Sequence, residues 1–158
     1  MGEVAGRRMT VEIDGDFVVF LIGARFNNRL QFARSLVDLG GRRGMKHMLD
    51  YLVERPEKGL LAYEMGLPTI VQYWRSFEHL EAFAKDKDDP HLDVWRQYWR
   101  RVGKSSRTGI WHETYLVQAG QYEAVYGNMP AHGLGKAGTL MPVSEASSAR
   151  SRITAVSA

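Results

Sequence analysis

Cysteine is absent from all 158 residues of the chain. Its absence excludes disulfides, thiolate metal sites, thiolate-ligated haem and a cysteine nucleophile, and the reducing cytoplasm is the expected compartment. An excess of one charge is missing too, because 21 basic and 18 acidic residues leave a net charge of +3. No basic stripe with interleaved aromatic residues stands out, so we expect no nucleic-acid partner.

Long apolar runs are also missing, and the longest, FVVFLIG, covers residues 17–23. This run is far shorter than the roughly 20 residues that a membrane helix needs, so no membrane partner is expected. Its β-branched and aromatic residues instead predict a central strand at 17–24.

The length of the chain predicts one domain. We place this domain at residues 16–138, after a flexible N-terminal arm at 1–15 that has mixed charge and little periodicity. Beyond it the chain is rich in serine, alanine and arginine and poor in large apolar residues, which predicts a flexible C-terminal tail at 139–158.

Hydrophobic periodicity predicts strands and helices in alternation within the domain. Asp89 followed by Pro90 marks the start of a helix, and Gly103 marks its end. Helices are expected at 30–39, 45–55, 76–85 and 90–102, and further strands at 60–65 and 69–75.

The segment 109–130 has the most distinctive pattern. Its two β-rich runs, 109–118 and 121–129, flank Ala119 and Gly120, which predicts a β-hairpin. The order of elements then fits an α+β, ferredoxin-like β-α-β-β-α-β fold with an extra C-terminal strand. Because the strands are apolar on both sides, we expect a second copy to cover the free sheet face, which gives a homodimer, a dimeric α/β barrel.

With this order of elements the chain resembles the dimeric α/β-barrel superfamily. Within it, the chain is similar to a group of bacterial and fungal monooxygenase-like proteins typified by a fungal polyketide monooxygenase, many of whose members are known only as a domain of unknown function. The stretches that carry the resemblance are VVFLIGARFNN (18–28), KHMLDYL (46–52), GLLAYEM (59–65), VQYWRSFEHLEAFAKD (71–86), HLDVWRQYW (91–99) and GIWHETYLVQAGQYEAVYGNMPAHGLGKAG (109–138).

The resemblance implies an enzyme that oxidises a small apolar or polyketide-like compound in a barrel pocket, without tightly bound flavin or nicotinamide. In such oxygenases a substrate that forms a stabilised carbanion is deprotonated and reacts with O2, and the protein supplies a base, hydrogen-bond donors and a dry cavity. Two alternatives remain open. One is a haem-binding barrel enzyme with a histidine as axial ligand, and the other is a non-catalytic dimeric module that binds a ligand.

His112 and Glu113 are the candidate catalytic residues, because both lie among apolar residues of a predicted strand. Neighbouring residues of a strand point to opposite faces, so one of the two is expected to meet the pocket. The structural alternatives are a buried histidine bonded to a nearby carbonyl or carboxylate, and a salt bridge from Glu113 to Arg75, Arg96 or Arg100.

Neutral hydrogen-bonding and aromatic residues complete the expected substrate site. They could hold a carbonyl or enolate oxygen and wall a cavity for a flat ligand, or serve only as core and dimer interface. His91 is the expected cofactor ligand if haem is bound, and otherwise a surface residue. His47 is expected on a helix surface and His132 in a loop. The spacing of the histidines and carboxylates does not indicate a metal site. The run GLGKAG lacks the glycine pattern of a nucleotide-binding loop, so no nucleotide is expected. The expected substrate-binding residues are Gln72, Tyr73, Trp74, Trp95, Tyr115, Tyr126 and Asn128.

Overall fold

The computed structural model describes residues 6–40, 44–66, 68–103, 106–144 and 147–155. Its main sheet is antiparallel, with the strand order β3-β4-β2-β5. The strands are β2 (Phe17–Phe26), β3 (Leu60–Met65), β4 (Thr69–Trp74) and β5 (Thr108–Val117). This order and the helices between the strands are those of the ferredoxin-like β-α-β-β-α-β fold, so the predicted fold class is confirmed.

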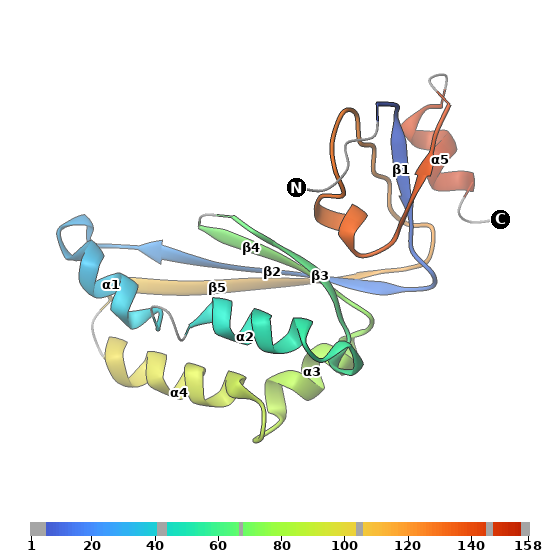
Figure 1. The fold of residues 1–158 in the computed structure, drawn as a ribbon. Helices are drawn as coiled ribbons and strands as arrows, with labels where there is room; N and C mark the ends of the chain where they lie inside the picture. The colour runs from blue at the N-terminus through green and yellow to red at the C-terminus, as the bar shows by residue number, and fades with distance from the viewer. Residues whose placement is uncertain (1–5, 41–43, 67, 104–105, 145–146, 156–158) are drawn as a thin grey trace.

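Helices lie along one face of this sheet, with α1 near the end of β2 (Figure 1). Ser76 caps α3, because its hydroxyl accepts the backbone N–H of His79. Asp89 and Pro90 begin α4 as predicted, and the chain turns out of that helix at Gly103 with a positive φ of 53°. The helices are α1 (Phe32–Asp38), α2 (Met45–Val53), α3 (Phe77–Lys85) and α4 (Pro90–Val102), with short 3-10 turns η1 (Arg29–Gln31) and η3 (Pro56–Lys58).

The main core lies between the sheet and these helices. Trp74 on β4 has no exposed surface and is the largest fully buried side chain. Its indole Nε1 donates to Oε1 of Gln72 at 2.9 Å, which satisfies both polar groups inside the core. The other buried members are Val18, Met48, Leu49, Leu52, Leu60, Leu80 and Phe83. No helix among the described residues has the length and apolar character needed to cross a bilayer.

A second, two-stranded sheet corrects the expectation of a flexible arm and tail. β1 (Met9–Glu12) pairs antiparallel with β6 (Thr139–Pro142), and helix α5 (Ala149–Ala155) follows. The strands are held because Val11 and Ile13 are buried together with Phe17 of the main sheet, which sequence composition alone does not reveal. Residues 1–5, 145–146 and 156–158 of the expected arm and tail lie outside the described residues.

The predicted hairpin is wrong in its second half, because residues 121–129 do not form a strand beside β5. The pairing recorded for this segment is a single bridge, in which Tyr126 exchanges backbone bonds of 2.8 and 2.9 Å with Met9. Tyr122, two residues after Gly120, packs edge-on against Phe17 at 5.3 Å between ring centroids. The alternating apolar side chains of this segment thus bury themselves across the sheet face rather than at its edge.

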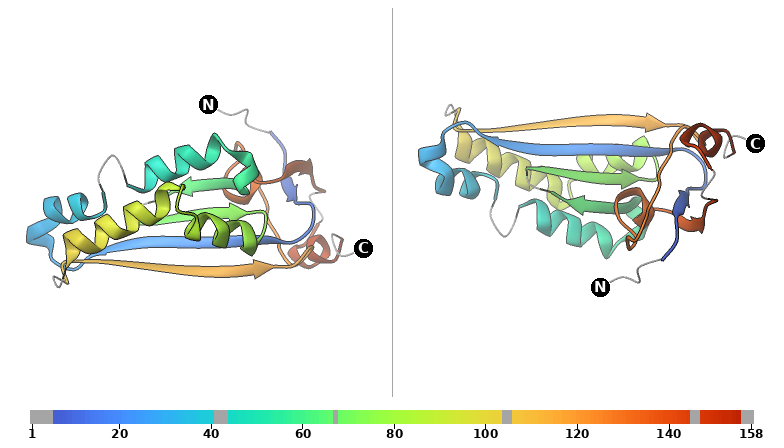
Figure 2. Two further views of the ribbon diagram at one scale, coloured as in Figure 1. Left: turned by 90° about the horizontal axis from the view of Figure 1, so that it is seen from below. Right: turned by 90° about the horizontal axis from the view of Figure 1, so that it is seen from above.

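The sheet face opposite the helices is covered at one end and open over the rest. Figure 2 shows the segment after β5 crossing that end, beside β1 and β6. The pairing register places Trp111, Glu113 and Tyr115 of β5 on the open face, opposite Gly23, Leu21 and Val19 of β2. Trp111 and Tyr115 remain 38% and 50% exposed. We call this surface the open sheet face.

Candidate functional site

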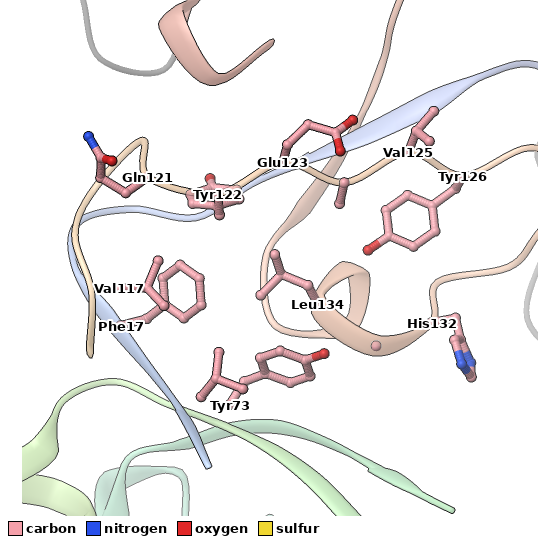
Figure 3. Close-up of a pocket in the computed structure, with 13 residues that line it drawn as sticks. Phe17, Tyr73, Val117, Gln121, Tyr122, Glu123, Val125, Tyr126, His132 and Leu134 are labelled. Carbon is pink, nitrogen blue, oxygen red and sulfur yellow. The ribbon is translucent and has the colours of Figure 1, made fainter. Parts of the chain in front are cut away.

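A pocket of about 540 Å³ lies where the covered end of the sheet meets the segment 121–134 (Figure 3). This volume is within the range of pockets that hold small molecules. Most of its walls are apolar, and two tyrosines, Tyr73 of β4 and Tyr126, contribute hydroxyl groups. We call it the tyrosine pocket. Its apolar walls come from Phe17, Val19, Val117, Val125 and Leu134.

The hydroxyls of Tyr73 and Tyr126 lie close to the backbone of η4 (Gly133–Lys136). The N–H of Gly135 donates to the carbonyl oxygen of His132 at 3.0 Å, and the backbone of Leu134 and of Gly135 acts to lower the pKa of Tyr73 and of Tyr126, respectively. Burial raises the pKa of both tyrosines, so both keep their protons at neutral pH. A protonated tyrosine hydroxyl is a hydrogen-bond donor, and both residues line the pocket. Figure 3 shows the two rings on either side of Leu134.

The glycines of η4 allow this close approach. A Cβ on Gly135 would lie 3.0 Å from Cζ and 3.1 Å from the hydroxyl oxygen of Tyr126. At Gly133, where φ is +55°, it would lie 3.3 Å from the hydroxyl of Tyr73. The glycine-rich sequence, which carries no nucleotide-loop pattern, therefore lets the backbone of η4 lie close to the two tyrosines.

Glu64 of β3 fixes η4 over the sheet. Its Oε1 accepts from the backbone N–H of Gly133 at 2.8 Å and from Nζ of Lys136 at 2.7 Å, and it lies 3.0 Å from Nδ1 of His132. Burial opposes ionisation, but these three donors outweigh it and hold the pKa of Glu64 below its ordinary value. A carboxylate anion therefore sits at the rim of the tyrosine pocket.

Sequence reasoning missed Glu64, His132 and Lys136 as site residues. Glu64 lies about 70 positions before His132 and Lys136 in the chain, and only the fold brings it to them. The available signal was the run HGLGK, in which glycines that permit close approach are flanked by a histidine and a lysine.

The predicted site residues fall into separate groups. Tyr73 and Tyr126 share the tyrosine pocket. Glu113 and Tyr115 lie beyond it on the open sheet face, where the Tyr115 hydroxyl donates to Oε2 of Glu113 at 2.6 Å. This hydrogen bond raises the pKa of Tyr115. Tyr115 pairs with Val19, which lines the pocket, so this pair lies next to the pocket on the same sheet face.

His112 points to the opposite, helix-covered side, so the predicted alternation of His112 and Glu113 is confirmed. Its ring lies 5.4 Å from that of Phe20. Gln72 and Trp74 face the same side and form a hydrogen bond with each other inside the core. Both are therefore core residues, which is the alternative to a role in substrate binding.

His91 and Trp95 are also far from the tyrosine pocket, on α4. His91 places Nδ1 3.1 Å from the carbonyl oxygen of Ala84 and stacks on Trp95 with 6.5 Å between centroids. Burial lowers the pKa of His91, which favours the neutral imidazole. Asn128 lies in an exposed loop with a φ of 51° and does not line the pocket.

The fold and pocket define the class as a ferredoxin-like α+β domain with an open, small-molecule-sized pocket at the covered end of its sheet. The chain belongs to the monooxygenase af470-like family, whose model matches residues 17–134. It is 30% identical over 124 residues to monooxygenase af470 of Aspergillus fumigatus, covering 72% of this chain and 43% of that protein.

A solved structure of an aldoxime dehydratase (OxdRE), in complex with butyraldoxime, has the same fold. It matches with a TM-score of 0.60 at 17% identity, over 84% of this chain and 39% of that chain. At this identity the likeness concerns the fold. The chain thus spans less than half the length of both proteins.

Proposed function

We propose that this protein is a monooxygenase-like enzyme that oxidises a small apolar or polyketide-like compound with O2, without tightly bound flavin or nicotinamide. The observation that carries the proposal is the pair of tyrosine O–H donors, Tyr73 and Tyr126, in one apolar pocket. Two O–H donors in an apolar pocket suit an oxygen atom on which negative charge develops. Membership of the monooxygenase af470-like family supports this assignment. The cytoplasm remains its expected compartment.

The substrate that fits these groups is a ketone with an acidic methylene group. A base removes one C–H proton, and the electron pair moves onto the carbonyl oxygen, which accepts hydrogen bonds from Tyr73 and Tyr126. The carbanion is then oxidised by O2 to a peroxide, with a new C–O bond. Loss of water breaks the O–O bond and the second C–H bond, so one oxygen atom leaves in a new carbonyl and the other in water.

A homodimer completes the proposal. Trp111, Glu113 and Tyr115 stay on the open sheet face, and a second copy packed sheet to sheet would cover them. In both compared proteins the matched segment covers less than half of the length, which leaves room for two such sheets. Glu113 would then lie between the two sheets, next to the tyrosine pocket, whereas His112 would stay on the helix side.

Dithranol, a hydroxylated anthrone with an acidic methylene opposite its carbonyl, is a suitable probe. We expect the enzyme to consume O2 with dithranol and to form the anthraquinone, measured by an oxygen electrode and by absorbance. Tyr73→Phe and Tyr126→Phe should each lower kcat/KM by about 10²-fold, the usual effect of losing one oxyanion donor. His47→Gln, on the exposed side of α2, is the matched control and should behave as the wild type.

O2 consumption no faster than the spontaneous reaction would refute the proposal. Tight binding of dithranol without turnover would instead favour the non-catalytic ligand-binding module.

Haem binding is the second candidate, and the chemistry of His91 fits it. Donation of Nδ1–H to the carbonyl of Ala84 would leave Nε2 with a free lone pair on a neutral ring, which is the form that binds iron. His91 would hold the haem beside Trp95, and the haem would supply redox chemistry at its iron. Titration with haemin tests this, because a Soret band lost in His91→Ala but kept in His112→Ala would establish His91 as the ligand.

A further inference from the structure

We propose that His132 is the general base of the tyrosine pocket and that Glu64 orients it. The inference rests on the proposed function, because it names the group that takes the proton from the substrate. It concerns a histidine that the sequence places in an ordinary loop.

The first argument is the contact between His132 and Glu64. Nδ1 of His132 lies 3.0 Å from Oε1 of Glu64, and an ionised carboxylate can only accept hydrogen bonds. The neutral imidazole must therefore carry its proton on Nδ1, and Nε2 keeps the lone pair that a base needs. Lys136 and the N–H of Gly133 bind the same carboxylate oxygen, so the orienting group is itself held in place.

The second argument is the position of His132. It lines the same pocket as Tyr73 and Tyr126, and Figure 3 shows it at the end of η4. Removal of a proton from a methylene group conjugated with a carbonyl needs a base at the carbon and donors at the oxygen, and this pocket supplies both. The His132 side chain is 58% exposed, so a proton that it takes can pass on to water. His112, by contrast, faces the helices.

The competing explanation is that Glu64 and His132 only latch η4 to β3. Two other donors, Gly133 and Lys136, already perform that task. The two explanations differ in their consequences, because a latch has no effect on proton transfer as long as the pocket stays folded.

Hydrogen exchange separates proton removal from oxidation. Under argon in D2O, we expect the wild type to exchange the methylene hydrogens of dithranol, and His132→Gln to exchange them about 10²-fold more slowly, as expected for loss of a general base. His132→Ala should regain exchange when imidazole is added, because the site is open to solvent. His47→Gln is the control for loss of an unrelated exposed histidine, and circular dichroism melts confirm that each variant is folded.

The outcomes distinguish the inference from the proposed function. If the wild type consumes O2 and folded His132→Gln exchanges and turns over equally fast, the inference is wrong and the proposed function stands. If the wild type exchanges hydrogen in a His132-dependent way but consumes no O2, the inference stands and the oxygenase proposal falls. A wild type that does neither refutes both.

Nitrogen NMR of labelled histidine tests the orientation without any substrate. We expect His132 to be the Nδ1–H tautomer in the wild type. In Glu64→Gln the amide can donate to Nδ1, which should shift the population towards the Nε2–H form and slow dithranol exchange by about 10-fold. An Nε2–H tautomer in the wild type, or an unchanged tautomer and exchange rate in Glu64→Gln, would overturn the role of Glu64.

Discussion

Replacing Asp38 by asparagine should destabilise the fold by about 2–4 kcal/mol at pH 7. The Asp38 carboxylate is 3% exposed and accepts from Nε of Arg107 at 2.7 Å, Nη2 of Arg107 at 2.9 Å and the hydroxyl of Thr108 at 3.1 Å. This contact joins the end of α1 to the start of β5. Asparagine keeps the size of the side chain but leaves the arginine without its counter-charge.

The magnitude follows from the burial of the two partners. Removing one member of a fully buried ion pair costs about 3–5 kcal/mol, because the other charge is left uncompensated. The side chain of Arg107 is 22% exposed and keeps part of its hydration, which lowers the expected cost to about 2–4 kcal/mol.

The pH dependence has a definite sign. Hydrogen bonds from Arg107 hold the pKa of Asp38 below its ordinary value, against the opposing effect of burial. The stabilisation is therefore complete above the pKa of the unfolded chain, about 3.9, and is lost as the pH falls through the lower pKa of the folded state. The difference between the wild type and Asp38→Asn should be constant down to about pH 5 and shrink below about pH 4.

Urea unfolding followed by tryptophan fluorescence measures this difference, because Trp74 is fully buried. Asp50→Asn is the matched control. Its ion pair with Lys46 is exposed, with side chains 48% and 67% accessible, and should contribute no more than about 0.5 kcal/mol. A loss in Asp38→Asn as small as that of the control, or a loss that persists unchanged below about pH 4, would refute the reasoning.

Further changes test the site and the assembly. Gly135→Ala should displace the ring of Tyr126, because the added Cβ would lie 3.0 Å from Cζ of that ring, and should weaken dithranol binding by about 10-fold, the effect of one lost hydrogen bond to the ligand; titration by fluorescence measures it, and wild-type affinity would contradict the role of the glycine. Trp111→Glu places a charge on the open sheet face and should convert a dimer into a folded monomer in sedimentation experiments; a wild type that is monomeric would contradict the dimer. Glu113→Gln should abolish turnover of dithranol in a folded dimer, whereas His112→Gln, on the helix side, should keep it; if both stay active, β5 is scaffold.

The elements of the main sheet could be predicted from the sequence because their causes are local. The apolar run at 17–23 can only be a buried strand, and the pair Asp89 and Pro90 suits a helix start whatever surrounds it. Alternation along a strand likewise placed His112 and Glu113 on opposite faces.

Elements whose partners are distant in sequence could not be predicted. The segment 121–129 has the alternation of a strand, but alternation does not say which surface it will bury against. Its side chains pack against Phe17 and the sheet face, and the segment therefore does not pair with the edge of β5. β1 and β6 lie about 130 positions apart, and each is too short and too polar to be recognised alone.

The amino-acid sequence by itself determined the ferredoxin-like order of elements and the chemical nature of Tyr73 and Tyr126 as donors, because composition and periodicity act within a few residues. The tertiary structure alone decided that these two tyrosines share a pocket, that glycines bring the η4 backbone to them, and that Glu64 meets His132. A site of this kind depends on contacts between segments about 70 residues apart, and such contacts are set by the burial of whole faces rather than by any local pattern.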